Sequence, residues 1–215
     1  MVKELQSKNP EIAVFSVFDE EFSTYGRTLR HINADEIIKV AEGFEMPSGI
    51  VYTPSVEAFE ALPVAQQIQD ECFGTLPTQI GYCYGQSHWM NATEWHTCSE
   101  VNIAVTDMIL ILGHVWDIKE NTIDSSLFKA FYMPKGTVAE VFSTTLHFCP
   151  CQVEDAGFRS VVCLPVGTNT ALEKPLADKR VTAKNKWLLA HVENEAKIKQ
   201  GAVAGITGIN FEIKY

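Results

Sequence analysis

Two carboxylates and one imidazole alternate along one short stretch of the chain. Glu94, His96 and Glu100 stand at even spacing in the run EWHTCSE, with Cys98 between the last two. Residues two apart on an extended strand project from the same face of a sheet. If this run is one strand, its carboxylates and imidazole therefore form a polar face on an otherwise apolar hairpin.

Such a face is typical of a metal site, because Glu and His supply the oxygen and nitrogen ligands of divalent ions. Buried carboxylates also need a cation or hydrogen-bond donors to offset their charge. Two further candidates follow in the sequence: Glu140, on a β-prone run after a Pro-x-Gly turn, and His147, at the start of another run. If the two hairpins face each other across a barrel, His147 completes a cluster with His96 and Glu100.

Each candidate also has an ordinary structural interpretation. A single His on a strand is usually a hydrogen-bonded core or surface residue, and Glu140 could occupy an exposed position beside the turn. Cys98, Cys149 and Cys151 share the ligand faces by parity, which makes a thiolate zinc site conceivable. However, Cys149-x-Cys151 lacks the spacing of a zinc knuckle. We expect the six cysteines to be reduced and mostly buried.

The composition excludes several classes of function. The chain has 215 residues, with 27 acidic against 17 basic side chains and a net charge of -10. Such an acidic chain is a poor ligand for nucleic-acid phosphates. No apolar run approaches the roughly 20 residues that span a bilayer, and no basic start followed by an apolar run predicts secretion. We therefore expect a cytoplasmic protein that binds neither nucleic acid nor membrane.

The elements that must position these residues are mainly β-strands. Short β-prone runs separated by Gly, Asn and Pro fill residues 79–165, and Glu94–Val105 is predicted as one continuous strand. Helices are predicted at Ala34–Glu42, around Ser55–Cys72 and from Asn185 towards Lys199, and a final strand at Gly205–Tyr215. We expect a single domain over 1–215, with a core at about 79–165 and the segments 1–78 and 166–215 packed on it.

The two motifs resemble those of the cupin superfamily. His96-x3-Glu100 matches the second half of the family's first motif, His-x-His-x3/4-Glu, and Glu94 stands where the first His is usual. Of the second motif, Pro-x-Gly-x2-His, this chain keeps the His, as His147, and its spacing. The resemblance implies a mainly β, single-domain cupin: a small antiparallel β-barrel or jelly roll with a few peripheral helices.

The whole chain is also similar to a group of bacterial cupin-like proteins. The similarity lies in the stretches EWHTCSEVNIAVTD, KGTVAEVFSTTLHFCPC, LPVGTN and NKWLLAH. A weaker resemblance to ureidoglycolate lyase rests on FSTYGRTL and on the spacing from Gly136 to His147.

The cupin resemblance implies that Glu94, His96, Glu100 and His147 bind a divalent metal ion. Two imidazoles and two carboxylates suit Zn²⁺, Mn²⁺ or Fe²⁺, and Ni²⁺ or Co²⁺ stays possible. Glu94 departs from the usual ligand type, so it is either a ligand or a proton carrier beside the ion.

The resulting hypothesis is a metal-dependent enzyme that acts on a small polyhydroxylated or keto-acid metabolite. We favour a sugar isomerase or epimerase, in which the ion stabilises an enediolate and Glu140 or Glu94 moves the proton. The alternatives are a lyase of the ureidoglycolate type, a dioxygenase and a non-catalytic metabolite-binding cupin. Exposed edge strands predict a homodimer.

Overall fold

The structure, a computed structural model that describes all residues 1–215, is built from three β-sheets. The largest has six strands, and every neighbouring pair in it is antiparallel. In spatial order its strands are β2 (Gly26–Thr28), β10 (Val138–Val141), β6 (Glu100–Ala104), β13 (Phe158–Pro165), β4 (Thr78–Gly85) and β3 (Ile50–Thr53).

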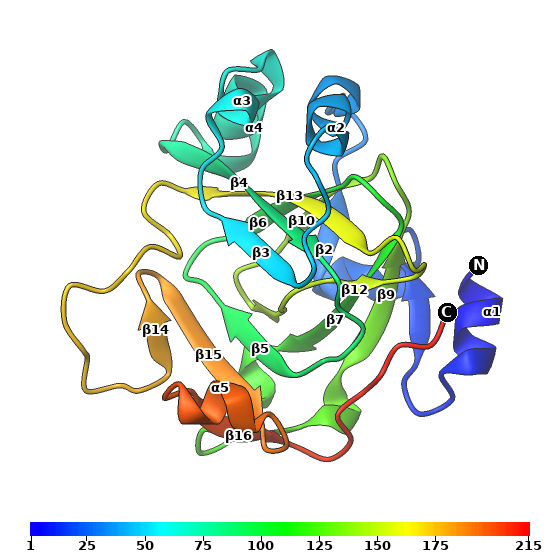
Figure 1. Ribbon diagram of the computed structural model, residues 1–215, viewed down its shortest axis with the longest axis vertical. Coiled ribbons are helices and arrows are strands. Elements are labelled where there is room, and N and C mark those ends of the chain that lie inside the picture. Colours follow the sequence, from blue (N-terminus) through cyan, green and yellow to red (C-terminus); the bar gives the residue numbers. More distant parts are fainter.

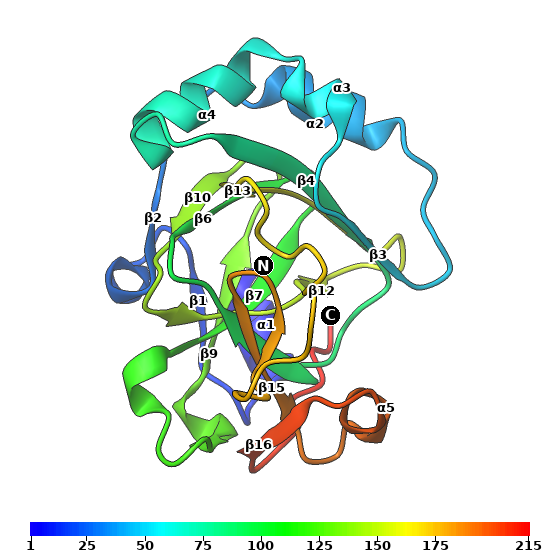
Figure 2. The same ribbon diagram turned by 90° about the vertical axis from the view of Figure 1, so that its left-hand side faces the viewer.

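Two smaller sheets lie below this one (Figures 1 and 2). The second sheet contains β1 (Val14–Ser16), β9 (Lys129–Met133), β7 (Met108–His114), β11 (Thr145–Leu146) and β12 (Cys151–Gln152). The third contains β14 (Val181–Ala183), β15 (Lys186–His191), β16 (Val203–Thr207) and β8 (Ile123–Asp124), and β5 (Ala92–Trp95) pairs with β15.

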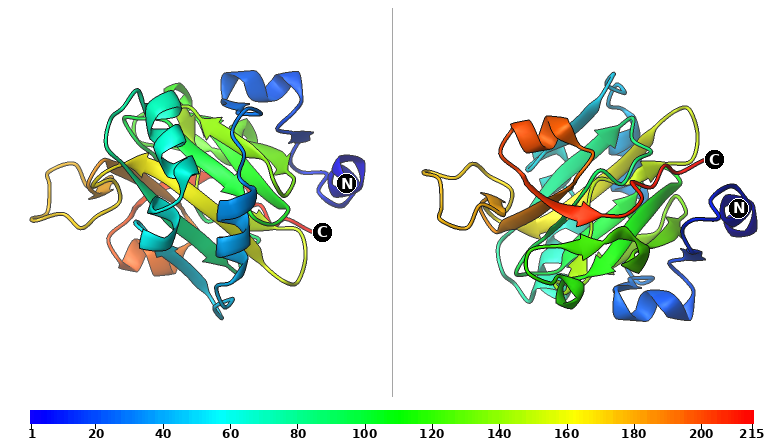
Figure 3. Two further views of the ribbon diagram at one scale, coloured as in Figure 1. Left: turned by 90° about the horizontal axis from the view of Figure 1, so that it is seen from above. Right: turned by 90° about the horizontal axis from the view of Figure 1, so that it is seen from below.

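The helices lie outside the barrel. They are α1 (Val2–Lys8), α2 (Asp35–Glu42), α3 (Glu57–Glu60), α4 (Pro63–Phe73) and α5 (Glu195–Lys199), with 3-10 turns at Glu20–Thr24, Val115–Asp117 and Ser125–Leu127. Helices α2 and α4 lie across the outer face of the six-stranded sheet (Figure 3). The predicted helix at 34–42 is confirmed, and Pro63 begins α4, where its missing N–H costs nothing.

The central strands β6, β10 and β13 of the six-stranded sheet are buried on both faces. Along β13, Val161 and Cys163 pack under the helices, whereas Val162 and Leu164 pack into the barrel. This alternation follows from the period of two along a strand, and it explains why the sequence here is almost continuously apolar. The predicted mainly β fold with a few peripheral helices is confirmed, and the single-domain organisation stays a prediction.

The prediction of one continuous strand over Glu94–Val105 is wrong. The chain forms β5, turns through His96–Ser99, and begins β6 at Glu100 in a different sheet. The corner is held by Asn185, whose side-chain Oδ1 accepts hydrogen bonds from the Thr97 N–H (3.0 Å) and hydroxyl (2.6 Å). The even spacing therefore does not place these side chains on one strand face.

The helix predicted from Asn185 is also wrong. Residues Lys186–His191 form β15, which pairs with β14, β16 and β5 and has its last four residues buried. A strand buried on both faces reads as a continuous apolar run, which periodicity alone cannot distinguish from a helix. Only the end of the predicted helix is helical, in α5.

The final strand is shorter and earlier than predicted. It ends at Thr207, and the residues beyond it run back to α1, where Asn9 exchanges two 2.8 Å hydrogen bonds with the Lys214 backbone. The two chain ends consequently lie close together (Figure 1). None of the helices combines the length and apolar sequence that a bilayer crossing needs.

Candidate metal centre

The turn between β5 and β6 brings the predicted ligands together between the sheets. Glu94 lies on β5, His96 in the turn, and Glu100 at the start of β6. His147 follows β11 and pairs with Glu94 through two backbone hydrogen bonds of 2.6 and 3.0 Å. Backbone pairing therefore fixes His147 opposite the first motif, and the predicted cluster of the two motifs forms.

The distances within the cluster are those of ligands that share one ion. His96 Nε2 and His147 Nε2 lie 3.6 and 3.5 Å from Glu100 Oε2, and His96 Nε2 lies 3.8 Å from Glu94 Oε1. These separations exceed the 2.7–3.2 Å of ordinary hydrogen bonds. Two ligands each about 2.1 Å from one ion at a tetrahedral angle are roughly 3.4 Å apart. The donor set therefore fits a divalent cation.

Both imidazoles are held with Nε2 directed at the cluster. His96 Nδ1 lies 2.7 Å from the Asn185 carbonyl oxygen, and His147 Nδ1 lies 3.1 Å from that of Thr145. A carbonyl only accepts, so each Nδ1 carries the donated proton, and the Nε2 lone pair of the neutral ring stays free. Both Nε2 atoms are buried without a hydrogen-bond partner. Metal-binding histidines show this second hydrogen bond almost always.

The carboxylates are oriented by neighbouring polar groups. Asn102 donates to Glu100 Oε1 at 2.8 Å and accepts from Ser160 Oγ at 3.1 Å, which leaves Glu100 Oε2 for the imidazoles. Lys186 Nζ forms an ion pair of 2.5 Å with Glu94 Oε2, and Glu94 Oε1 faces His96. Each carboxylate thus presents one oxygen to the cluster and binds a fixed partner with the other.

The electrostatics of the cluster are strongly coupled. Burial alone would raise the pKa of Glu100, but His147 and His96 outweigh burial and hold that pKa below its usual range. Burial opposes charge on His147, yet Glu100 and then Glu94 raise the pKa of this imidazole to about 9. Burial likewise opposes the charge of Lys186, and Glu94 outweighs it and raises the lysine pKa. Without an ion, a proton on His147 therefore offsets part of the negative charge.

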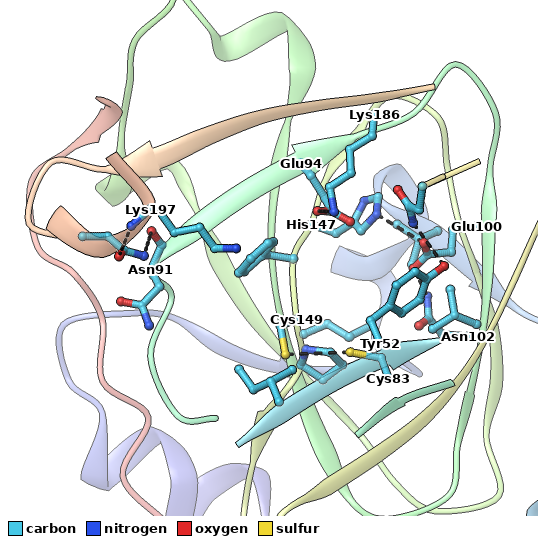
Figure 4. Close-up of a pocket in the computed structure, with 18 residues that line it drawn as sticks. Tyr52, Cys83, Asn91, Glu94, Glu100, Asn102, His147, Cys149, Lys186 and Lys197 are labelled. Carbon is cyan, nitrogen blue, oxygen red and sulfur yellow. Dashed lines mark hydrogen bonds and ion pairs between the residues drawn. The ribbon is translucent and has the colours of Figure 1, made fainter. Parts of the chain in front are cut away.

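A cavity of about 340 Å³ opens beside the cluster (Figure 4). This size is at the small end of ligand pockets, so it suits a small metabolite. Its lining comes from all three sheets and from α5. The polar residues of the lining are Tyr52, Asn91, Glu94, Glu100, Asn102, His147, Asn169, Lys186, Asn194 and Lys197.

Glu140 does not reach this cavity. Its neighbour Val141 lines the cavity, so Glu140 projects from the opposite, helix-covered face of β10. There its Oε2 accepts a 2.7 Å hydrogen bond from Arg27 Nε in an ion pair. The structure therefore does not bring Glu140 together with the other predicted site residues.

The thiols do not form a zinc site with the cluster. All six cysteines are free. Cys83 and Cys149 line the cavity with their sulfur atoms 3.9 Å apart, and Cys98 Sγ accepts a hydrogen bond from the Asn185 side chain. Cys151 is buried among apolar residues elsewhere, where burial raises the pKa of its thiol to about 12.

The buried ligand atoms of Glu94, His96 and His147 lie within 4.8 Å of one another, so these three residues form a possible metal site. A family model described as a domain of unknown function (DUF4867) matches residues 14–211. The chain belongs to this family. No curated protein matches the chain in sequence.

Among solved structures, the chain is similar to oxalate decarboxylase from Bacillus subtilis. In a structure used to assign the Mn(II) centres of that enzyme, the identity is 10% and the TM-score 0.34. A structure of the same enzyme at pH 4.6 has an identity of 10% and a TM-score of 0.33 to this chain. Both matches cover 56% of this chain, but the chain spans only 26% of the enzyme. Similarity at this level does not identify the reaction of the DUF4867 chain.

Three residues of the centre escaped the sequence interpretation. Lys186 lay in a segment predicted as helix, and Tyr52 lay in a short run, IVYT, that no motif marks. Asn102 could have been predicted, because it comes two residues after Glu100 and therefore lies on the same face of β6.

We expect Lys186→Met to destabilise the ion-free protein by about 3 kcal/mol, because it leaves the Glu94 carboxylate buried without its cation. Urea unfolding, with and without added Mn²⁺, measures this loss of stability. Mn²⁺ should restore most of the loss, since the ion replaces the missing positive charge. Lys184→Met, which removes an exposed ion pair to Glu173, is the control and should change stability by less than about 1 kcal/mol. Equal losses in the two variants would contradict the prediction.

Proposed function

We propose that the protein is a metal-dependent enzyme that acts on a small polyhydroxylated or keto-acid metabolite. The observation that carries this proposal is the pair of buried Nε2 atoms, on His96 and His147, that lack any hydrogen-bond partner. Leaving two such atoms unsatisfied next to two carboxylates is costly unless a cation binds between them. The adjoining cavity gives a small molecule access to that position.

The residues divide into two groups in this proposal. His96, His147 and Glu100 hold the ion, because Glu100 Oε2 lies 3.6 and 3.5 Å from the two Nε2 atoms, nearer than the 3.8 Å between Glu94 Oε1 and His96 Nε2. Glu94 carries the proton: its Oε1 faces the cluster, and Lys186 binds its other oxygen and orients the carboxylate. Glu140, which lies on the other face of β10, has no part in the reaction.

The reaction we propose is isomerisation or epimerisation of a sugar through an enediolate. A bound divalent ion supplies Lewis acidity towards neighbouring carbonyl and hydroxyl oxygens. Glu94 then removes a proton from one carbon and returns it to the adjacent carbon or to the opposite face. The Lys186 ammonium, through its ion pair with Glu94 Oε2, holds this side chain in position for both transfers.

The test combines metal content with proton exchange in D₂O. The purified protein should bind about one Mn²⁺ per chain, and a panel of aldoses, ketoses and their phosphates should reveal one compound that gains deuterium at carbon. Glu94→Gln should retain the ion and lose exchange by more than about 100-fold, because the amide cannot accept the proton. The exchange is followed by NMR.

Other outcomes of the same test separate the remaining functions. Loss of the ion in Glu94→Gln would make Glu94 a fourth ligand. Cleavage of a compound would instead support the lyase, and tight binding without turnover would support a metabolite-binding cupin. A wild-type protein that takes up no divalent ion would overturn the proposal. A homodimer and a cytoplasmic location stay predictions beside it.

A further inference from the structure

The cavity has a second polar end, away from the cluster. Figure 4 shows the side chain of Lys197 directed into the cavity from the side opposite Glu94, Glu100 and His147. Lys197 comes from α5, a different element from those that carry the cluster. A ligand that fills the cavity therefore meets a carboxylate–imidazole cluster at one end and a lysine at the other.

Lys197 has no carboxylate partner. The other lysine of the cavity, Lys186, is paired with Glu94, whereas no ion pair or side-chain hydrogen bond involves Lys197. Its Nζ lies 5.6 Å from the centre of the Phe148 ring, which also lines the cavity. In a chain with ten more acidic than basic side chains, a half-buried lysine without a carboxylate is a charge free for a ligand.

The backbone of Lys197 is held in place relative to the cluster. Asn194 caps α5, and its Oδ1 accepts a 3.2 Å hydrogen bond from the Lys197 backbone N–H. The same side chain donates a 3.2 Å bond to the backbone oxygen of Asn91, which lines the cavity just before β5. Glu94 lies on β5 itself. One chain of hydrogen bonds therefore joins the Lys197 backbone to the segment that leads into the strand of the cluster, so the helix that carries the lysine is held beside the cavity.

We propose that Lys197 binds an anionic group, a phosphate or a carboxylate, at the end of the substrate remote from the cluster. This assignment rests on the proposed function and narrows its substrate to an acidic metabolite: a sugar phosphate, a sugar acid or a keto acid. Lysine is a point charge that serves such groups well, and the ammonium lies over the Phe148 ring, which also lines the cavity.

The test compares three probes of equal carbon number: ribose, ribose 5-phosphate and ribonate. Calorimetry of the Mn²⁺-loaded protein should show that at least one charged probe binds more tightly than ribose. Lys197→Gln should weaken that charged probe by about tenfold or more and leave ribose and the Mn²⁺ content unchanged. The probe that loses affinity identifies the group, phosphate or carboxylate.

Lys199→Gln is the matched control, since Lys199 belongs to the same helix but is exposed and paired with Glu195. It should leave the affinity of all three probes unchanged. Equal weakening of ribose and of the charged probes in Lys197→Gln, or no preference for either charged probe in the wild type, would overturn the assignment. Absence of bound Mn²⁺ would overturn the proposed function instead, and the preference of the metal-free protein for charged probes would still decide the role of Lys197.

Discussion

Replacing His147 by alanine should abolish stoichiometric binding of Mn²⁺. His147 Nε2 is one of the two buried nitrogen atoms that point at the cluster without a partner, and the ring is fixed by the Thr145 carbonyl. Removal of an outer hydrogen-bond partner alone typically costs 10- to 100-fold in metal affinity, so loss of a ligand should cost more than about 100-fold. Metal analysis after dialysis should give well under 0.1 ion per chain, compared with about one in the wild type.

The same substitution also leaves Glu100 buried with less positive charge around it. This should destabilise the ion-free variant by about 3 kcal/mol. His147→Gln fills a similar volume and guards against a folding defect, and circular dichroism shows that each variant retains its β structure. His31→Ala is the control, because His31 is exposed and forms a surface pair with Glu71. If folded His147→Ala keeps the wild-type ion content, the cluster is not the binding site.

The sequence predicted the cluster better than it predicted the path of the chain through it. Ligand types and spacing identified His96, Glu100 and His147, and these three side chains do converge. Even spacing alone does not produce this convergence, however, because it depends on the turn at His96–Ser99, which Asn185 holds from a distant part of the sequence. Such a contact has no local signal, so a single continuous strand was the natural interpretation of EWHTCSEVNIAV.

The wrong prediction for Glu140 and the failure to predict Lys186 have the same physical origin. The face on which Glu140 projects depends on strand register, and a shift of one residue exchanges the two faces of a strand. Val138 and Glu140 lie on the face towards the helices, whereas Val141 faces the cavity. Lys186 was missed because the buried strand β15 lacks a polar face that would distinguish it from a helix. Both cases require knowledge of neighbours that only the folded chain supplies.

Metal affinity should rise steeply with pH up to about pH 9. In the ion-free protein Glu100 and Glu94 raise the pKa of His147 to about 9, so this imidazole is protonated at neutral pH. An ion that binds Nε2 must displace that proton, because only the neutral ring is a ligand. Affinity should therefore increase about tenfold per pH unit well below pH 9, and about 50-fold in all from pH 7 to pH 9, where half of the rings are neutral. A histidine with an ordinary pKa near 6.5 would give almost constant affinity over this interval.

The stability of the ion-free protein should change in the opposite direction. His147 has a folded pKa above its unfolded value, so its contribution is fully present below about pH 6.5 and is lost as the pH rises through about 9. The shift corresponds to at most about 3 kcal/mol. Unfolding by urea without metal should thus become easier between pH 6.5 and 9, while the stabilisation produced by a fixed Mn²⁺ concentration grows.

Calorimetry in buffers of different ionisation enthalpy separates this explanation from a general effect of pH. At pH 7 the wild type should release close to one proton per Mn²⁺ bound, and the release should fall towards zero above pH 9. His147→Gln has no such proton, so its ion-free stability should lose the decline between pH 6.5 and 9. Constant affinity from pH 7 to 9 with no proton release would show that His147 is neutral before the ion arrives. The two carboxylates would then have to be neutralised by Lys186 and the ion alone.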